Sequence, residues 1–161
     1  MSNESLVNYA EQNDTKKIQE LLESSANINQ FEHRKSALHA ACVSNAIDAA
    51  ELLIKSRIDV NLRDELTGAT ALHYCAVYNL FEIANEILKN KGNLDIVDNY
   101  GNQSLWTAVF NVKGKDERLP LVELYLMYGA NKNHKNKAGR SPLNFAEQVM
   151  YEPLLKLLNK Y

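Results

Sequence analysis

TALHYCA, residues 70–76, can be laid over three other segments of the chain, SALHAAC, QSLWTAV and SPLNFAE. The leucines of the four segments stand 34, 33 and 38 residues apart, at Leu38, Leu72, Leu105 and Leu143. A period in the low thirties indicates stacked supersecondary units and not one irregular core. Stacked units present an extended surface, so the period favours a binding protein over an enzyme.

Residues 98–131 show how one unit is built. Gly101 stands in a polar stretch typical of a tight turn, where glycine adopts positive φ without steric cost. Apolar spacings of three and four over 105–109 predict a short helix, and 119–127 predict a longer one that Gly129 ends. Both are shorter than the roughly 12–15 residues that an isolated helix needs. We therefore expect neighbouring units to hold them by packing.

The order of these elements resembles the ankyrin repeat: a turn with Asp and Gly, a Thr/Ser-Pro/Ala-Leu-His element, a leucine-rich second helix and Gly-Ala-Asn. The match is carried by GANKNHKNKAGRSPLNFA (129–146) and GATALHYCA (68–76). The resemblance implies an all-α ankyrin-repeat solenoid of about five helix-turn-helix units with short turn fingers, the terminal units acting as caps. We expect a single domain over 1–161, with repeats at about 1–30, 31–64, 65–97, 98–135 and 136–161.

The family histidine is kept at two of the four aligned positions. It is present as His39 and His73, becomes Trp106 in the fourth unit and is Asn144 in the fifth. In the family this side chain ties neighbouring turns together, so we expect structural hydrogen bonds from His39 and His73 and no metal or catalytic role. Trp cannot accept a hydrogen bond. The ring of Trp106 either fills space beside the turns or anchors a partner, and both interpretations stay open.

Two further departures concern loops. Arg34 stands where other units have glycine, and because Arg disfavours positive φ, we expect a reshaped or strained turn. The 38-residue interval comes from VKGKDER, residues 112–118, where other units use about two residues. This segment, called the insert below, predicts a projecting surface loop. It is either a tolerated insertion or part of a binding face.

Composition is that of an ordinary soluble protein, with 45% hydrophobic and 24% charged residues. Charge is uneven, because residues 1–100 hold 9 basic and 15 acidic side chains whereas 101–161 hold 9 and 5. The basic excess lies mostly at Lys132, Lys135, Lys137 and Arg140. This patch is either a solvated junction or a surface that steers an acidic partner. We expect no nucleic-acid partner, because the chain is not basic overall and aromatic residues do not alternate with the patch.

Several functional classes find no support in the sequence. Cys42 and Cys75 occupy the apolar face of equivalent helices, which predicts small buried hydrophobes and neither a disulfide nor a zinc site. The chain contains no catalytic or phosphate-binding motif, so we expect no catalytic residue, metal or cofactor. No basic leader with an apolar run begins the chain, and no window approaches the roughly 18 apolar residues of a membrane span. We expect a cytoplasmic protein without membrane contact.

The resemblance implies that partners are held by the turn tips and by the exposed face of each first helix. Aromatic side chains stand out on this face, and Tyr78, Tyr100, Phe110 and Trp106 are expected to form one central aromatic cluster, with Tyr74 as a secondary candidate. The predicted partner-binding residues are Tyr78, Tyr100, Asn102, Trp106, Phe110, Asn111, Lys113, Lys115, Arg118, Lys137 and Arg140.

The favoured hypothesis is a non-catalytic protein–protein interaction module that is monomeric when free and binds another protein through its concave face. The sequence also looks similar to small bacterial ankyrin proteins, some of which neutralise a toxin. This likeness favours an immunity-type role in which the concave face covers the active site of a toxin or effector, with charge complementarity speeding capture. The alternatives are a regulatory adaptor or accessory subunit and, from other classes, an enzyme or a nucleic-acid binder.

Overall fold

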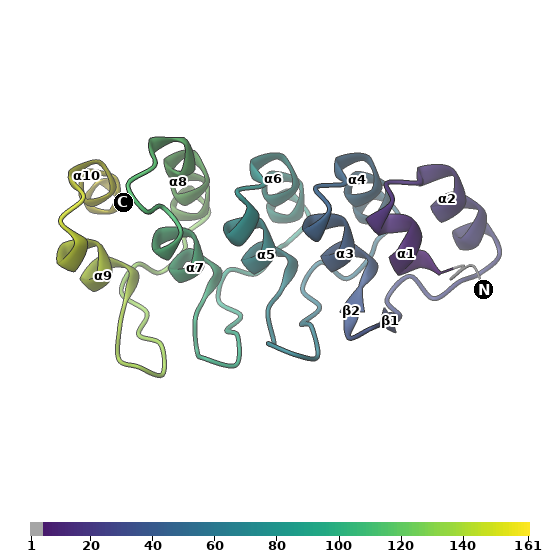
Figure 1. The fold of residues 1–161 in the computed structure, drawn as a ribbon, viewed down its shortest axis with the longest axis horizontal. Helices are drawn as coiled ribbons and strands as arrows, with labels where there is room; N and C mark the ends of the chain where they lie inside the picture. The colour runs from purple at the N-terminus through teal and green to yellow at the C-terminus, as the bar shows by residue number, and fades with distance from the viewer. Residues whose placement is uncertain (1–4) are drawn as a thin grey trace.

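The computed structural model describes residues 5–161, which form helix pairs standing side by side in a row (Figure 1). Over these residues there are ten α-helices, or five pairs that we number as units 1 to 5. The units are α1 (Leu6–Glu11) with α2 (Thr15–Glu23), α3 (Ala37–Val43) with α4 (Ile47–Lys55), α5 (Ala71–Tyr78) with α6 (Phe81–Lys89), α7 (Ser104–Phe110) with α8 (Leu119–Met127), and α9 (Pro142–Val149) with α10 (Glu152–Lys160). The expected helical solenoid is confirmed.

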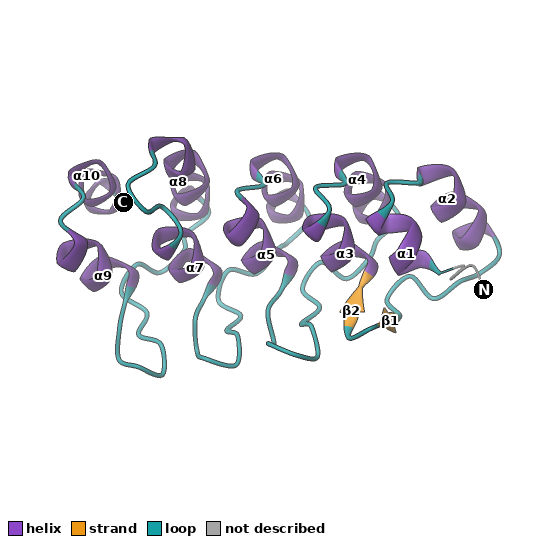
Figure 2. Ribbon diagram, in the orientation of Figure 1, coloured by secondary structure: helices purple, strands orange, loops and turns teal. Residues whose placement is uncertain are grey.

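Loops before α3, α5, α7 and α9 project to one side of the row as fingers (Figure 2). The first helix of each unit, the inner helix, stands next to the fingers, and the second, outer helix lies beyond it (Figure 1). Backbone N–H groups of one finger donate to carbonyls of the finger before it. These bonds run from Glu65 to Arg34 at 3.0 Å, from Asn99 to Thr67 at 2.8 Å and from Lys137 to Tyr100 at 3.0 Å.

The repeated leucines form the centre of the apolar layer between the helices. Leu38, Leu72 and Leu105 are at most 1% exposed, whereas Leu143 of the terminal unit is half-buried. Cys42 and Cys75 are both fully buried in this layer, as expected, and their Sγ atoms lie 3.9 Å apart. Burial raises the pKa of the Cys75 thiol well above its ordinary value. Both cysteines therefore act as small apolar side chains between neighbouring inner helices.

Two buried histidines fasten the fingers to the inner helices. Nδ1 of His73 accepts from the backbone N–H of Thr70 at 3.1 Å, so the ring is neutral and its Nε2–H donates to the carbonyl of Asn102 at 2.9 Å. His39 makes the equivalent bond to the carbonyl of Ala69 at 3.1 Å. Burial lowers the pKa of His39 to about 4 and also lowers that of His73. The structural hydrogen bonds expected from both histidines are confirmed.

The finger of unit 2 differs from the others at the position of the missing glycine. It is a hairpin of β1 (Phe31–Glu32) and β2 (Lys35–Ser36), and its two turn residues, His33 and Arg34, have φ of 48° and 68°. Positive φ at both central residues is the geometry of the two-residue hairpin turn that Asn and Gly favour. The expected reshaping is confirmed, with Arg34 held in the left-handed region.

We expect Arg34→Gly to raise the free energy of unfolding by up to about 1 kcal/mol. Glycine removes left-handed strain of roughly 1–2 kcal/mol, which exceeds the roughly 0.4–1 kcal/mol that it costs through the unfolded chain. Urea unfolding measures the difference. Lys35→Gly, on the neighbouring strand residue, serves as the control and is expected to destabilise. A loss of stability in Arg34→Gly would show that the turn is unstrained.

Candidate functional site

The fingers and inner helices of units 3 and 4 enclose a hollow of about 270 Å³. Its walls include Tyr74 and Tyr78 from α5, together with Tyr100 from the finger of unit 4. Tyr78 is 46% exposed and Tyr100 is 68% exposed. The structure therefore brings together two of the predicted aromatic residues on one face, and adds the secondary candidate Tyr74 to them. We call this the tyrosine hollow.

Tyr74 is held in place from three sides. Its ring meets His39 edge-on at 5.2 Å and Tyr78 at 6.5 Å, and Nζ of Lys35 lies 5.7 Å from its centroid. Burial, and then the negative charge of Asp64, raise the pKa of Tyr74 to about 12. Its hydroxyl is thus protonated at neutral pH, and a side-chain hydrogen bond to Asp64 contributes to the raised pKa.

Carboxylates inside the fingers fix the backbone on which Tyr100 stands. The Asp98 carboxylate accepts from the N–H groups of Tyr100 at 2.8 Å and Asn102 at 2.9 Å. The Asn102 amide donates to Asp98 at 3.0 Å and accepts from Asn136 at 2.8 Å. Both ends of the Asn102 amide are thus engaged within the fingers. This weakens its case as a partner contact and makes it a residue that positions the fingers.

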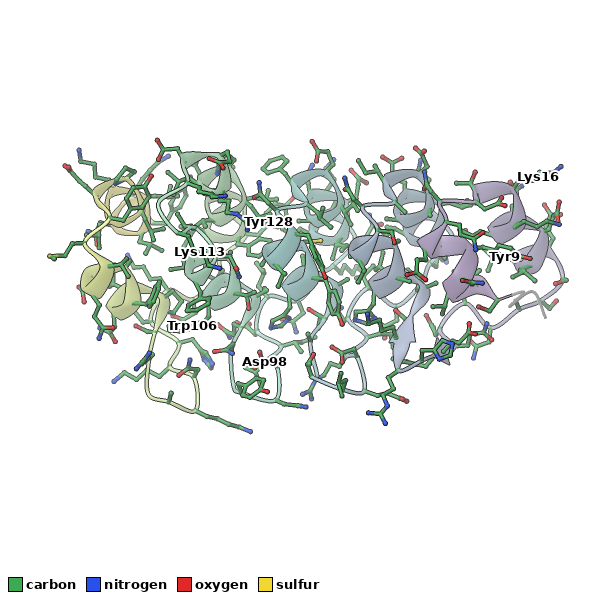
Figure 3. All side chains as sticks on the ribbon, viewed as in Figure 1. Tyr9, Lys16, Asp98, Trp106, Lys113 and Tyr128 are labelled. Atoms are coloured by element: carbon green, nitrogen blue, oxygen red, sulfur yellow. The ribbon has the colours of Figure 1, made fainter. Side chains whose placement is uncertain are left out.

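The predicted single aromatic cluster is wrong, because Trp106 and Phe110 form a second group in units 4 and 5. Trp106 stacks on Phe110 at 6.4 Å and meets Phe145 of α9 edge-on at 5.5 Å. Across residues 5–161, no ring contact joins this group to Tyr78 or Tyr100. Trp106 is half-buried on α7 (Figure 3), so its ring fills space between two inner helices, where the histidines of other units reach a finger.

The insert lies on the surface but does not project freely, which corrects the expected loop. Val112 is 1% exposed, and Asp116–Arg118 form a 3₁₀ turn, labelled η1. The Arg118 guanidinium donates to the Val77 carbonyl at 3.2 Å, at the end of α5. Asp116 accepts from the hydroxyl of Tyr151 in unit 5. The insert therefore bridges units 3 and 5, and Arg118 has a structural use within the chain.

An apolar pocket of about 390 Å³, here called the insert pocket, opens between α7, the insert and α9–α10. Phe110 and Lys113 belong to its lining, as do three residues that the sequence did not point to, Phe145, Met150 and Tyr151. Phe110 is 47% exposed and Met150 is 80% exposed. Sequence reasoning missed the pocket because its walls come from two units and from the folded course of the insert.

Of the remaining predicted partner-binding residues, some have side chains that form hydrogen bonds within the chain and others do not. Asn111 donates to the Thr107 carbonyl at 2.8 Å, and Nζ of Lys137 donates to the Asn99 carbonyl at 2.7 Å. Lys115 and Arg140 are exposed, and no side-chain bond of either is found in the described chain. These two cations are therefore available to an acidic partner, whereas Asn111 and Lys137 serve the fold first.

Metal-binding geometry is not found in the part of the chain that the structure describes. Residues 5–161 contain no group of three or more His, Cys, Asp and Glu side chains placed to hold a metal ion. Among the same residues, no helix is both long enough and apolar enough to cross a bilayer.

Comparison with protein families places residues 2–64 on a model of three ankyrin repeats and residues 67–99 on a model of one ankyrin repeat. Together these two matches cover more than half of the chain. The chain belongs to the ankyrin repeat family. Units 4 and 5 lie largely beyond the matched residues, and these ankyrin units carry Trp106, the insert and the insert pocket.

Several curated proteins are similar to this one. Ankyrin repeat protein L371 of Acanthamoeba polyphaga mimivirus is 30% identical over 80% of the chain, and palmitoyltransferase AKR1 of Kluyveromyces lactis is 33% identical over 62%. The chain spans only 16% and 14% of these two relatives. Ankyrin repeat protein YahD of Escherichia coli is 21% identical over 88% of the chain, which spans 71% of it. The shared part is ankyrin repeat, which indicates a protein-interaction module.

Proposed function

We propose that this ankyrin repeat chain binds another protein through the face formed by its fingers and inner helices, and that it has no catalytic activity of its own. The observation that carries the proposal is the row of exposed aromatic side chains on this face, Tyr100, Tyr78 and Phe110. Exposed apolar groups rimmed by polar residues mark interaction sites, and aromatic residues supply much of the binding energy in interfaces.

The uneven distribution of charge along the chain favours a partner whose own surface has an acidic end and a basic end. The acidic excess of residues 1–100 and the basic excess of 101–161 place opposite charges toward the two ends of the row. A partner with the reverse arrangement would be oriented before contact, which raises the association rate more than the final affinity. Nucleic acid is the weaker candidate, because phosphate binding relies on a dominant basic surface.

The favoured specific role is that of an immunity-type inhibitor, with the concave face covering the active site of a toxin or effector. A regulatory adaptor or accessory subunit is the alternative. An assay of the partner's own activity separates them, because an inhibitor abolishes that activity at a one-to-one ratio whereas an adaptor leaves it intact. Genes next to the coding sequence would name the partner to test first. We further propose a cytoplasmic monomer, which light scattering of the purified chain tests.

We expect Tyr78→Ala to weaken the partner complex about tenfold without changing the melting temperature, because a half-exposed aromatic side chain at an interface centre is typical of a binding hot spot. Calorimetry with the purified partner measures the affinity. Tyr128→Ala is the matched control, since Tyr128 is 45% exposed and lies away from the fingers that hold Asp98 (Figure 3). Equal affinities of the two variants would move the interface off the tyrosine hollow.

A further inference from the structure

We propose that the insert pocket receives one large apolar side chain of the partner protein, flanked in the partner by acidic residues. This inference rests on the proposed binding function and gives that function a second anchor point, separate from the tyrosine hollow.

The pocket has a closed apolar floor and open walls. Val109, Val112 and Leu154 are each 1% exposed and form the floor. Phe110 and Phe145, whose ring centroids are 5.4 Å apart, contribute one wall. A volume of about 390 Å³ lies in the range of roughly 300–1,000 Å³ that ligand pockets occupy. The space therefore suits one aromatic or long aliphatic side chain.

The insert creates this pocket and is fixed in position on both sides. Its buried Val112 joins the floor, and its Lys113 and Gly114 form the rim. The Arg118 bond to the Val77 carbonyl and the hydrogen bond between Tyr151 and Asp116 attach it to the units before and after. A pocket built this way is largely formed before binding, which reduces the entropy cost of association.

Two residues of the lining also break a pattern that the other units keep. The left-handed residue that follows the inner helix is Asn13, Asn45 and Asn79 in units 1 to 3, with φ of 57°, 53° and 59°. Asn is among the residues that tolerate this conformation best. Unit 5 places Met150 there instead, with φ of 51°, and unit 4 places the buried Val112 there and turns left-handed one residue later, at Lys113 with φ of 48°. The chain thus accepts backbone strain at the two positions that border the pocket.

The positive charge at the rim of the insert pocket favours acidic residues on either side of the partner's apolar side chain. Lys113 is the one charged residue in the described lining, and its Nζ lies 6.0 Å from the Phe110 centroid. Lys115 follows two residues later, and neither lysine forms an ion pair within residues 5–161. The neighbouring carboxylates, Asp116 and Glu117, act on Tyr151 instead: Asp116 accepts the hydrogen bond from the Tyr151 hydroxyl, and the charges of both carboxylates help to raise the pKa of Tyr151. Two unpaired cations beside an apolar pocket favour an apolar side chain between carboxylates.

The three methionines of the chain allow a direct test by NMR of the full chain with ¹³C-methyl-methionine. Met150 reports on the pocket, and Met127, which is 65% exposed at the end of α8, is the internal control. The probes are two end-blocked tripeptides, Asp-Trp-Asp and Lys-Trp-Lys. We expect Asp-Trp-Asp to shift the Met150 methyl signal saturably and leave Met127 unchanged. Lys-Trp-Lys is expected to need about fivefold higher concentration, because it meets the rim with like charge.

Lys113→Glu is expected to reverse the order of the two peptides. Lys91→Glu is the matched control and is expected to change nothing, since Lys91 is likewise exposed and left-handed, with φ of 69°. Three results would each overturn the proposal. They are a Met150 methyl signal that does not shift with Asp-Trp-Asp, equal shifts with both peptides, and an unchanged order of peptide affinities in Lys113→Glu.

Met150→Asn separates binding from folding. Because Asn relieves the left-handed strain, this variant is expected to keep or raise the melting temperature while weakening Asp-Trp-Asp binding, followed from the peptide signals. Met127→Asn should alter neither quantity, and undiminished peptide binding in Met150→Asn would contradict the inference. The peptide experiment needs no natural partner, so its failure would leave the test at Tyr78 standing, and the converse also holds.

Discussion

Leu72→Ala is expected to lower the free energy of unfolding by roughly 2–5 kcal/mol, the range for a buried leucine that leaves a cavity. Leu72 is 1% exposed in α5, the inner helix of the central unit. Its backbone carbonyl also accepts a 2.6 Å hydrogen bond from the fully buried hydroxyl of Tyr125 in α8. The site is thus packed from its own unit and from the next, and little room exists for neighbouring side chains to collapse into the cavity.

The central place of Leu72 adds a second expectation. Stability in a repeat array is close to a sum of unit terms and nearest-neighbour interface terms, so a defect in unit 3 weakens its interfaces with units 2 and 4 together. Urea unfolding followed by circular dichroism measures the loss. Leu66→Ala is the control, because Leu66 is 63% exposed at a finger tip and surface changes stay within about 0.5 kcal/mol. A loss below about 1 kcal/mol for Leu72→Ala would contradict the assigned register.

The sequence was sufficient for the scaffold because each scaffold feature depends on near neighbours. Leu38, Leu72 and Leu105 recur with the helix pair, and all three are buried. His39 and His73 bond fingers one unit ahead, a relation that the period itself contains. Arg34 at a glycine position predicted an altered turn, and the hairpin has that form. A periodic chain converts such local rules into a whole fold.

The candidate site depends on contacts between distant residues and on side-chain directions, and the repeat period predicts neither. Arg118 reaches the carbonyl of Val77, 41 residues earlier, so the course of the insert could not be read from its composition. Trp106 joins Phe110 and Phe145 and not the tyrosines, because side-chain direction and not spacing decides which rings meet. One signal was present but unused: Met150 stands where Asn45 and Asn79 occur in earlier units.

Acidification from pH 7 to pH 4 is expected to cost about 3 kcal/mol of stability through His39 alone. Its pKa is about 4 in the folded protein because of burial, against 6.5 for the ordinary group. Above pH 6.5 the ring is neutral in both states and the contribution is complete. Between pH 6.5 and 4 the unfolded chain binds a proton that the folded chain excludes, so stability falls by about 1.4 kcal/mol per pH unit. Below pH 4 the folded ring is protonated as well, and this loss stops.

The effect of His39 can be isolated by substitution and by pH window. His73 shifts in the same direction and adds to the slope. Protonation of Asp64 affects stability only at lower pH. Burial raises the pKa of this carboxyl, but hydrogen bonds from Thr67 and from backbone N–H groups outweigh the burial and lower the pKa overall. His39→Asn, which copies Asn144 of unit 5, is expected to flatten the slope between pH 6.5 and 4, whereas His33→Asn, at a side chain 80% exposed, leaves it unchanged. Urea unfolding at pH 7, 5.5 and 4.5 measures the slopes, and equal slopes for His39→Asn and the unaltered chain would mean that the buried imidazole does not control the acid response.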